Sequence, residues 1–376
     1  MTPRVRWAQV AGWRARRHQL DTRVGPAAMH DVVARLCGLH AQLTSSAELT
    51  LLARVEGLDP SALRDALWKE RSLVKLWAMR GTLHVFGSDD YRMWQAGLGT
   101  YTHFRQPGWL KGFDVTAIDL DRLLDAVEQP LDGRRLTRGE LADEVARRSR
   151  SKKLGEQVLG SWGSLLKPAS YTGRLCFAPD KGRNVAFTGP RRWLRLRRTD
   201  AIGGDSALTD ITRRYLATNA PVTPDDLGRW WGGLGPGPAR RRIEALGEEV
   251  TQVDVEGQPM YVLERDVREL TKAEPVHSVR LLPAFDQYVV AATKHPEELM
   301  PGAFANRVYR PQGWLSAVLL VNGRMDGVWK HERKGKRLVV TIEPFAPVPK
   351  VVRRDAEAEA EGVAGFLGGE LHVAWV

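Results

Sequence analysis

The 376-residue sequence contains only two cysteines, Cys37 and Cys176, which stand far apart in apolar surroundings. Such a pair forms neither a disulfide framework nor a metal-ligand cluster, so we expect no metal site and a cytoplasmic protein. No apolar run approaches the ~18 residues that a membrane-spanning helix needs, and the first residues lack the apolar core of a signal peptide. The sequence therefore predicts no membrane partner.

Several motifs by which enzymes hold nucleotides or activate nucleophiles are also missing. The chain has no Gly-rich phosphate loop, no Cys/His metal spacing and no nucleophile elbow. The stretch from Gly232 to Gly237 is a Gly-Pro loop and not a nucleotide cradle. We therefore expect no cofactor.

Positive charge is what the chain has in excess. It holds 56 Lys and Arg against 45 Asp and Glu, for a formal net charge of +11 and a pI near 9.8. Such a balance favours a polyanionic partner, and nucleic acid above all. The alternative is an Arg-rich codon bias. With 43% hydrophobic residues, the chain is long enough to fold into two to four domains with cores of their own.

Three successive stretches each combine helices with a strand hairpin, which is the order of a winged-helix unit. In the first we expect helices at 7–17, 26–36, 46–55 and 60–68, then a hairpin at 73–86. In the second we expect helices at 120–127, from 137 and at 157–166, then a hairpin at 174–187. In the third we expect helices at 208–217, 223–230 and 238–246, then a hairpin at 250–263.

Capping residues mark several of these helix starts. Thr137 and Glu140 have the spacing of a capping box, and Thr223 precedes a proline at a first-turn position. Ser45 or Ser46 is expected to cap the helix that carries the following leucines.

After residue 276 the pattern changes to short strands, with Asn322-Gly323 as a two-residue hairpin turn between two of them. We expect strands at 278–282, 314–321, 327–330 and 337–342, followed by a helix at 355–367. The predicted fold class is therefore α+β, with three tandem winged-helix units and a C-terminal α+β, β-rich region. The predicted boundaries are 1–115, 116–200, 201–275 and 276–376.

Basic residues gather near the predicted wings and helices. Lys181 and Arg183 stand at the tip of the second hairpin, and Arg191 and Arg192 follow it beside Trp193. We predict that these four cations bind DNA, although most charge runs are only solvated faces. The other basic runs are Arg4, Arg6, Arg14, Arg16 and Arg17 on the first helix, Arg147, Arg148, Arg150, Lys152 and Lys153, expected to follow the second unit's middle helix, and Arg195, Arg197 and Arg198 after its wing.

Four stretches of the chain resemble one family. They are Leu-Cys-Gly-Leu-His-Ala-Gln at 36–42, Leu-Trp-Ala-Met-Arg-Gly-Thr-Leu-His at 76–84, Leu-Leu-Pro-Ala-Phe-Asp-Gln-Tyr at 281–288, and the run from Gly-Trp to Val-Trp at 313–329. In this order they resemble the AlkZ/YcaQ-like bacterial DNA glycosylases, which excise alkylated bases and unhook interstrand cross-links. The Met-Arg-Gly-Thr-Leu-His stretch is the sharpest mark of the resemblance.

The resemblance implies three tandem winged-helix units that form a basic channel for duplex DNA. The family's catalytic motif is glutamine, an apolar residue and glutamine, and a subgroup has histidine first; the matching positions here are His40, Ala41 and Gln42. His40 and Gln42 are thus the predicted catalytic residues. Arg80 and His84 are predicted to bind DNA or to support the site, and both self-resistance and general repair remain open as biological roles.

A guanine alkylated at N7 is positively charged and already a good leaving group, so the site needs no strong general acid. Gln42 can orient a water against C1′, and a neutral His40 can accept its proton. The motif supplies no lysine for a Schiff base, so we expect a monofunctional DNA glycosylase. Without the resemblance, His40 would be interpreted as a core or helix-end histidine and Gln42 as a hydrogen-bonding residue at a helix start.

The expected partner is double-stranded DNA containing alkylated purines, bound by a monomer that associates with the nucleoid. The alternative function is a non-catalytic winged-helix transcriptional regulator, which would tolerate replacement of His40 and Gln42 and would dimerise on half-sites. A scaffold that binds RNA or protein is the third interpretation, and it rests on charge alone. Asp286 and Gln287 are expected to be either structural or DNA-facing.

Overall fold

The computed structural model describes residues 2–197, 201–291 and 297–376. These residues form two compact units, which we call unit 1 (1–62 with 212–376) and unit 2 (63–211). The division into four parts made from the sequence stays a prediction. Arg198, the last member of the basic runs, lies outside the described residues.

Unit 1 begins with a short strand and three helices. They are β1 (Arg4–Val5), α1 (Trp7–Arg17), α2 (Met29–Arg35) and α3 (Thr44–Leu52). The prediction of α1 is confirmed, and this helix buries Trp7, Val10 and Trp13. The predicted serine cap of α3 is wrong: Leu43 is the N-cap residue and makes no side-chain cap, while Ser46 is buried within the helix.

The third predicted hairpin also lies in unit 1, after a set of short helices. The helix α12 (Gly204–Asn219) spans the boundary from unit 2 into unit 1, and the elements that follow it are α13 (Pro224–Trp231), α14 (Pro236–Glu244), β8 (Val250–Val255), β9 (Gln258–Leu263) and α15 (Val267–Thr271). Thr223 caps α13 by accepting a hydrogen bond from the backbone N–H of Asp226, as its sequence predicts. The strand β1 adds to β8 in parallel, so the start of the chain extends this hairpin into a three-stranded sheet.

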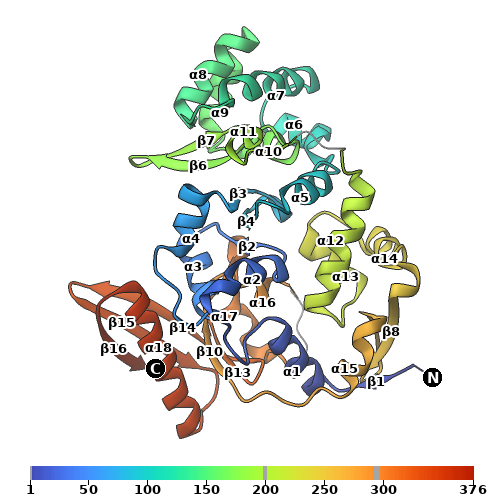
Figure 1. The fold of residues 1–376 in the computed structure, drawn as a ribbon, viewed down its shortest axis with the longest axis vertical. Helices are drawn as coiled ribbons and strands as arrows, with labels where there is room; N and C mark the ends of the chain where they lie inside the picture. Colours follow the sequence, from blue (N-terminus) through green and yellow to red (C-terminus); the bar gives the residue numbers. More distant parts are fainter. Residues whose placement is uncertain (1, 198–200, 292–296) are drawn as a thin grey trace. The chain divides into compact units, whose positions relative to one another are not determined.

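A five-stranded sheet with the order β10-β13-β14-β15-β16 forms the C-terminal part of unit 1. Its strands are β10 (Val279–Leu282), β13 (Val318–Val321), β14 (Arg324–Lys334), β15 (Arg337–Pro344) and β16 (Glu370–Trp375). The helix α18 (Lys350–Leu367) packs on the sheet through Ala356 and Ala360 and starts five residues earlier than predicted (Figure 1). Asn322 and Gly323 both have positive φ in the turn between β13 and β14, as an Asn-Gly hairpin requires.

The strand predicted over 314–321 is divided in the structure. Its first part, β12 (Trp314–Leu315), pairs with β11 (Tyr309–Arg310) in a separate two-stranded sheet. The helix α17 (Ala305–Val308) precedes this small hairpin. Only the second part, β13, joins the large sheet, so the prediction of one continuous strand is wrong.

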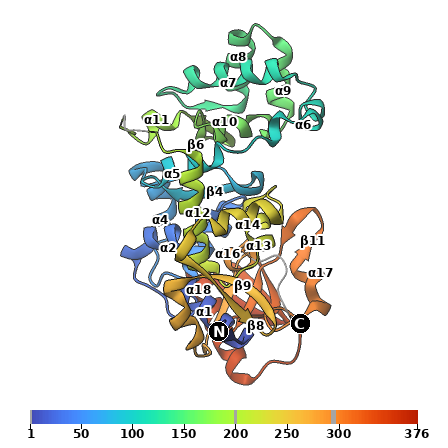
Figure 2. The same ribbon diagram turned by 90° about the vertical axis from the view of Figure 1, so that its right-hand side faces the viewer.

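Unit 2 contains two hairpins and a group of helices. Its elements are β3 (Leu73–Trp77), β4 (Leu83–Gly87), α5 (Tyr91–Leu98), α6 (Pro107–Gly112), α7 (Ala117–Leu131), β5 (Leu136–Thr137), α8 (Arg138–Ser149), α9 (Lys152–Gly160), α10 (Lys167–Tyr171), β6 (Cys176–Lys181), β7 (Asn184–Thr188) and α11 (Pro190–Trp193); α4 (Ala62–Asp65) spans the boundary with unit 1. The helices α7, α8 and α9 lie together beside the β6–β7 hairpin in both views (Figure 1, Figure 2). Together with β5, which pairs with β7, they have the element order of a winged helix.

Two expectations for unit 2 need correction. The helix predicted over 157–166 does not exist as one piece, because α9 ends at Gly160 and both Trp162 and Gly163 have left-handed backbone angles. Arg147 and Arg148 lie within α8 and do not follow it. The capping box of α8 is confirmed, since Thr137 accepts a hydrogen bond from the backbone N–H of Glu140. In the described part of the chain, no helix has the length and apolar character needed to cross a membrane.

Candidate active site and nucleic-acid interface

The end of α2 determines where His40 lies. Cys37 and Gly38 both have positive φ, at 57° and 87°, and this left-handed turn ends the helix and leads into the short strand β2 (Leu39–His40). The turn is held from outside by two hydrogen bonds, one of them buried. Gln287 Nε2 donates to the carbonyl of Gly38 at 2.6 Å, and Thr218 Oγ1 donates to the carbonyl of Arg35 at 2.6 Å. The segment before His40 is therefore fixed by residues far away in the sequence.

The two predicted catalytic residues differ in exposure. The side chain of His40 is buried, and its ring stacks on Phe285 with centroids 4.6 Å apart and planes inclined by 11°. Phe285 in turn meets Trp314 edge-on, at 5.0 Å and 72°, and Trp314 is 42% exposed. Gln42, two residues after His40, is exposed ahead of α3. One member of the pair is thus held inside the protein, and the other reaches solvent.

Phe285, whose ring stacks on His40, has an unusual backbone conformation. Its φ is 62°, a left-handed conformation that a bulky side chain rarely adopts. Such strain persists only where surrounding contacts enforce it, and it is common at functional sites. The following residue, Asp286, supplies these contacts.

Asp286 is fully buried and forms a two-point ion pair with Arg54, with Nη1 to Oδ2 at 2.8 Å and Nη2 to Oδ1 at 2.7 Å. Its carboxylate also accepts from the backbone N–H of Tyr288 at 2.9 Å, which caps α16 (Gln287–Val290). Arg54 donates further to the carbonyls of His18 and Thr50. The structure thus gives Asp286 a structural role beneath the site, and the DNA-facing alternative does not fit its burial.

His18 lies against the same ion pair. Its Nε2 is 3.0 Å from Asn219 Oδ1, and its ring meets Tyr288 edge-on at 5.1 Å. Complete burial, followed by the charge of Arg54, lowers the pKa of His18 to about 3. This histidine is therefore neutral at physiological pH and belongs to the support of the site.

Unit 2 carries the Met-Arg-Gly-Thr-Leu-His stretch on the turn between β3 and β4. Arg80 is half-buried with φ 57°, and Gly81 follows with φ 68°. His84 is buried on β4, with Nδ1 3.2 Å from the carbonyl of Thr82. Their predicted roles in DNA binding or site support stay predictions.

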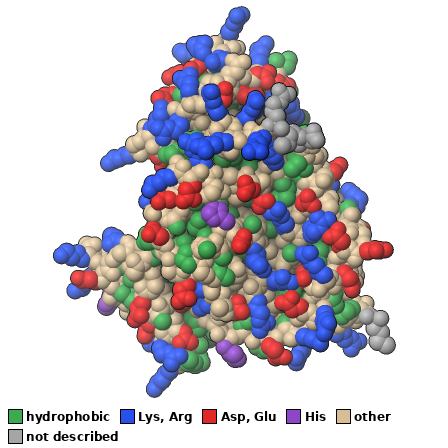
Figure 3. All heavy atoms as spheres, viewed as in Figure 1, with side chains coloured by type: hydrophobic (Ala, Val, Ile, Leu, Met, Phe, Trp, Pro, Cys, Tyr) green, Lys and Arg blue, Asp and Glu red, His purple; other side chains and the backbone are tan. Residues whose placement is uncertain are grey.

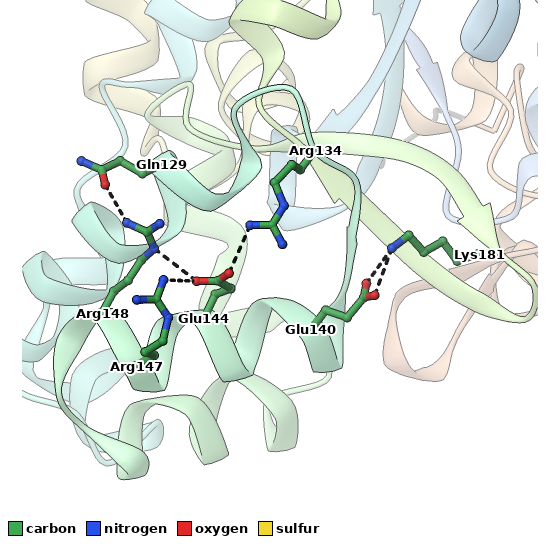
Figure 4. A network of polar contacts seen from close by, with 7 residues as sticks. All are labelled: Gln129, Arg134, Glu140, Glu144, Arg147, Arg148 and Lys181. Carbon is green, nitrogen blue, oxygen red and sulfur yellow. Dashed lines mark hydrogen bonds and ion pairs between the residues drawn. The ribbon is translucent and has the colours of Figure 1, made fainter.

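The predicted wing cations fall into two groups. Lys181 Nζ lies 3.0 and 2.9 Å from the two carboxylate oxygens of Glu140 on α8, so its charge is already neutralised (Figure 4). The backbone N–H of Thr137 and the ammonium of Lys181 together lower the pKa of Glu140 to about 2. Arg183 and Arg191 are exposed, and so is Arg192, whose Nη1 lies 3.9 Å from a carboxylate oxygen of Asp132.

Nearby, Glu144 gathers three arginines, namely Arg134, Arg147 and Arg148, at 3.2, 2.6 and 3.3 Å (Figure 4). Figure 3 shows lysine and arginine side chains gathered over the part of the molecule that Figure 1 labels α7 to α9, β6 and β7. Carboxylates thus offset part of the positive charge of this surface. The remaining exposed cations keep the charge that a polyanion would meet.

Reasoning from the sequence missed the parts of Phe285 and Trp314 in the site. The only available signal was that both lie in stretches that carry the family resemblance. Within the described ranges, no group of three or more His, Cys, Asp and Glu residues could hold a metal ion. The site provides the imidazole of His40, the amide of Gln42 and the aromatic rings of Phe285 and Trp314. These groups suit a reaction in which the protein positions a water molecule.

Comparison with known proteins identifies relatives of the whole chain. The model of the family described as DNA glycosylase AlkZ-like matches residues 33–366. An interstrand DNA cross-link repair glycosylase of Streptomyces sahachiroi is 33% identical over 364 residues, which covers 96% of each chain. The solved structure of the Streptomyces sahachiroi DNA glycosylase AlkZ superimposes with a TM-score of 0.90 and 33% identity, over 99% of this chain and 100% of that one.

These matches span nearly the whole chain and include the segments that build the site. They confirm the resemblance predicted from the four stretches, and the structural match confirms the α+β fold class. The chain belongs to the AlkZ-like DNA glycosylase family.

Proposed function

We propose that this protein removes N7-alkylated purines from duplex DNA by hydrolysing the bond between base and sugar. Membership of the AlkZ-like DNA glycosylase family supports the reaction type. Because the Streptomyces sahachiroi relative is named as an interstrand cross-link repair glycosylase, we extend the proposal to purine adducts that join the two strands. The observation that carries the proposal is the motif from His40 to Gln42, in which Phe285 stacks on the buried His40, Gln287 holds the turn before it, and Gln42 is exposed.

In the proposed reaction the bond between C1′ and N9 breaks, and its electron pair neutralises the positive charge of the alkylated base. The sugar becomes oxocarbenium-like, and water attacks C1′. The exposed Gln42 can hold this water, because its amide both donates and accepts hydrogen bonds. The water's proton passes to the imidazole of His40 or to solvent. Stacking on Phe285 keeps that ring in one orientation, which is a requirement of positional catalysis.

We propose further that the enzyme is monofunctional and works as a monomer. The motif brings no amine that could attack C1′, so water is the nucleophile and an abasic site is the product. A regulator that binds half-sites would dimerise. A sizing column therefore separates the glycosylase from the alternative function independently of any activity assay.

The decisive experiment is base release from duplex DNA that carries an N7-alkylguanine, followed by alkaline cleavage of the product. We expect wild-type protein to give strand breaks only after alkali. Gln42→Ala and His40→Ala should each reduce the single-turnover rate by at least about 100-fold, as loss of one positioning or proton-accepting group does in other enzymes. Both variants should still bind the duplex.

Exposed residues of the same types in unit 1, Gln252 and His277, offer matched controls. Gln252→Ala and His277→Ala should leave the rate unchanged. Strand breaks without alkali would contradict the monofunctional assignment. The absence of base release from both small and bulky adducts, with normal DNA binding, would favour the regulator.

A further inference from the structure

A lysine that forms no ion pair within the described ranges lies beside the Met-Arg-Gly-Thr-Leu-His turn of unit 2. Lys167 begins α10, and its Nζ would lie 3.2 Å from a Cβ placed on Gly81. The hydroxyl of Tyr171, one helical turn later, would lie 3.4 Å from the same atom. The ammonium and the phenol hydroxyl therefore line one small space that Gly81 leaves open. Because Gly81 also has φ 68°, any other residue at this position would be strained and would crowd both groups.

Neither polar group has a partner among the residues that the structure describes. Among the described residues, no carboxylate forms an ion pair with Lys167, and its half-buried position lowers the pKa of its ammonium. The hydroxyl of Tyr171 is buried without a hydrogen-bond partner. A buried hydroxyl left unpaired destabilises a protein, so such groups usually have a ligand or water to meet.

The surroundings hold these two groups in place. The ring of Tyr171 meets Tyr101 edge-on at 5.1 Å and His103 at 6.0 Å, and the Arg80 backbone forms a hydrogen bond with the Tyr101 hydroxyl. Partial burial and the nearby charge of Lys167 lower the pKa of His103. The space is thus lined by one cation and one free O–H donor on a rigid aromatic wall.

We propose that Lys167 and Tyr171, beside the turn at Gly81, bind a backbone phosphate of DNA. A phosphodiester carries one negative charge and several acceptor oxygens, so it can neutralise Lys167 and accept from the Tyr171 hydroxyl at the same time. Lys181 is the contrasting case, because Glu140 already occupies its ammonium. The proposal rests on the proposed function only in taking DNA as the source of the phosphate.

The first test measures binding of the full-length protein to an undamaged duplex over a range of salt concentrations. Each phosphate contact contributes about 0.9 to the slope of log K against log salt, so Lys167→Met should reduce that slope by about one. Lys336→Met, at an exposed position in the turn between β14 and β15, is the control of equal charge and should not change the slope. Equal slopes for wild type and Lys167→Met, or equal losses in both variants, would overturn the proposal.

Tyr171→Phe separates ligand binding from folding. If the hydroxyl awaits a phosphate, its removal weakens DNA binding several-fold while the free protein keeps or gains thermal stability, because an unpaired buried group is lost. Unchanged DNA binding, or a clear loss of stability, would show that the hydroxyl serves the fold.

Amine labelling of the wild-type protein avoids variants altogether. Bound duplex should slow acetylation of Lys167 several-fold, as quantified by mass spectrometry, and should leave Lys336 unaffected. If inorganic phosphate stabilises the wild type but not Lys167→Met, while duplex gives Lys167 no protection, the site takes free phosphate and the assignment to DNA is overturned. None of these measurements depends on base release, so failure of the proposed reaction would be seen separately.

Discussion

Two clusters of charged residues in this protein differ in their exposure to solvent. In unit 1, Arg54 and Asp286 pair with both side chains fully buried, directly beneath the residue that stacks on His40. In unit 2, the partly exposed Glu144 draws three arginines on the surface (Figure 4). The exposed network belongs to charge runs that are obvious in the sequence, whereas the buried pair joins two isolated residues 232 positions apart. Charge that is obvious in the sequence therefore lies on the surface, whereas the buried pair supports the residues next to His40.

Breaking the buried pair should have the largest effect. Arg54→Met leaves the Asp286 carboxylate buried without its partner, and the expected loss is about 3–5 kcal/mol of unfolding free energy. The midpoint of urea denaturation, at an unchanged slope, measures this loss. Because Asp286 also caps the helix that carries Gln287, we expect base release to fall as well.

The matched control removes an arginine of the exposed network. Arg147→Met should change the unfolding free energy by less than about 1 kcal/mol, since its partner is partly exposed. Comparable losses in Arg54→Met and Arg147→Met would mean that burial does not distinguish the two clusters. High salt sharpens the test, because it screens only exposed pairs.

A second prediction concerns pH and follows from His18. Its folded pKa of about 3 lies below its ordinary value of 6.5. Between pH 3 and pH 6.5 the imidazole is therefore protonated in the unfolded chain and neutral in the folded chain. The contribution of His18 to the free energy of unfolding is therefore complete above pH 6.5. It is lost as the pH falls toward 3, and the loss is about 2 kcal/mol at pH 5. His18→Gln keeps an N–H donor for Asn219 but cannot titrate, so its stability should depend less on pH in this window. Parallel pH profiles of the two proteins would contradict this role.

Features set by a few neighbouring residues could be predicted from the sequence. The capping boxes at Thr137 and Thr223 and the Asn322-Gly323 hairpin follow from side chains within three positions of one another. The same local reasoning was wrong over 157–166, because a tryptophan at positive φ ends the helix where its apolar pattern continues. Trp162 is 84% exposed, whereas a Cβ on Gly163 would lie only 3.1 Å from the ring of Trp77, and the local pattern does not show this close approach.

The site was predicted only in part, for a different reason. Local sequence and the family resemblance lead to His40 and Gln42, but the contacts that hold His40 and the turn before it come from residues near 218 and 285. No periodicity links such distant positions. The resemblance marked the stretch around Phe285, and the structure was needed to show that its ring lies on His40.

The smallest expected effect concerns the exposed network itself. Arg147, followed by Arg134 and Arg148, lowers the pKa of Glu144 to about 2, yet these groups are open to solvent, so Glu144→Gln should cost less than about 1 kcal/mol of unfolding free energy. Removing the carboxylate also frees three arginines, so affinity for undamaged duplex should rise at low salt and the salt slope should steepen. Asp143→Asn, a neighbour on α8 that is exposed, controls for the change in net charge. Equal DNA affinity of the two variants would show that Glu144 does not hold these arginines away from DNA. The surface network would then differ from the buried pair only in its exposure to solvent.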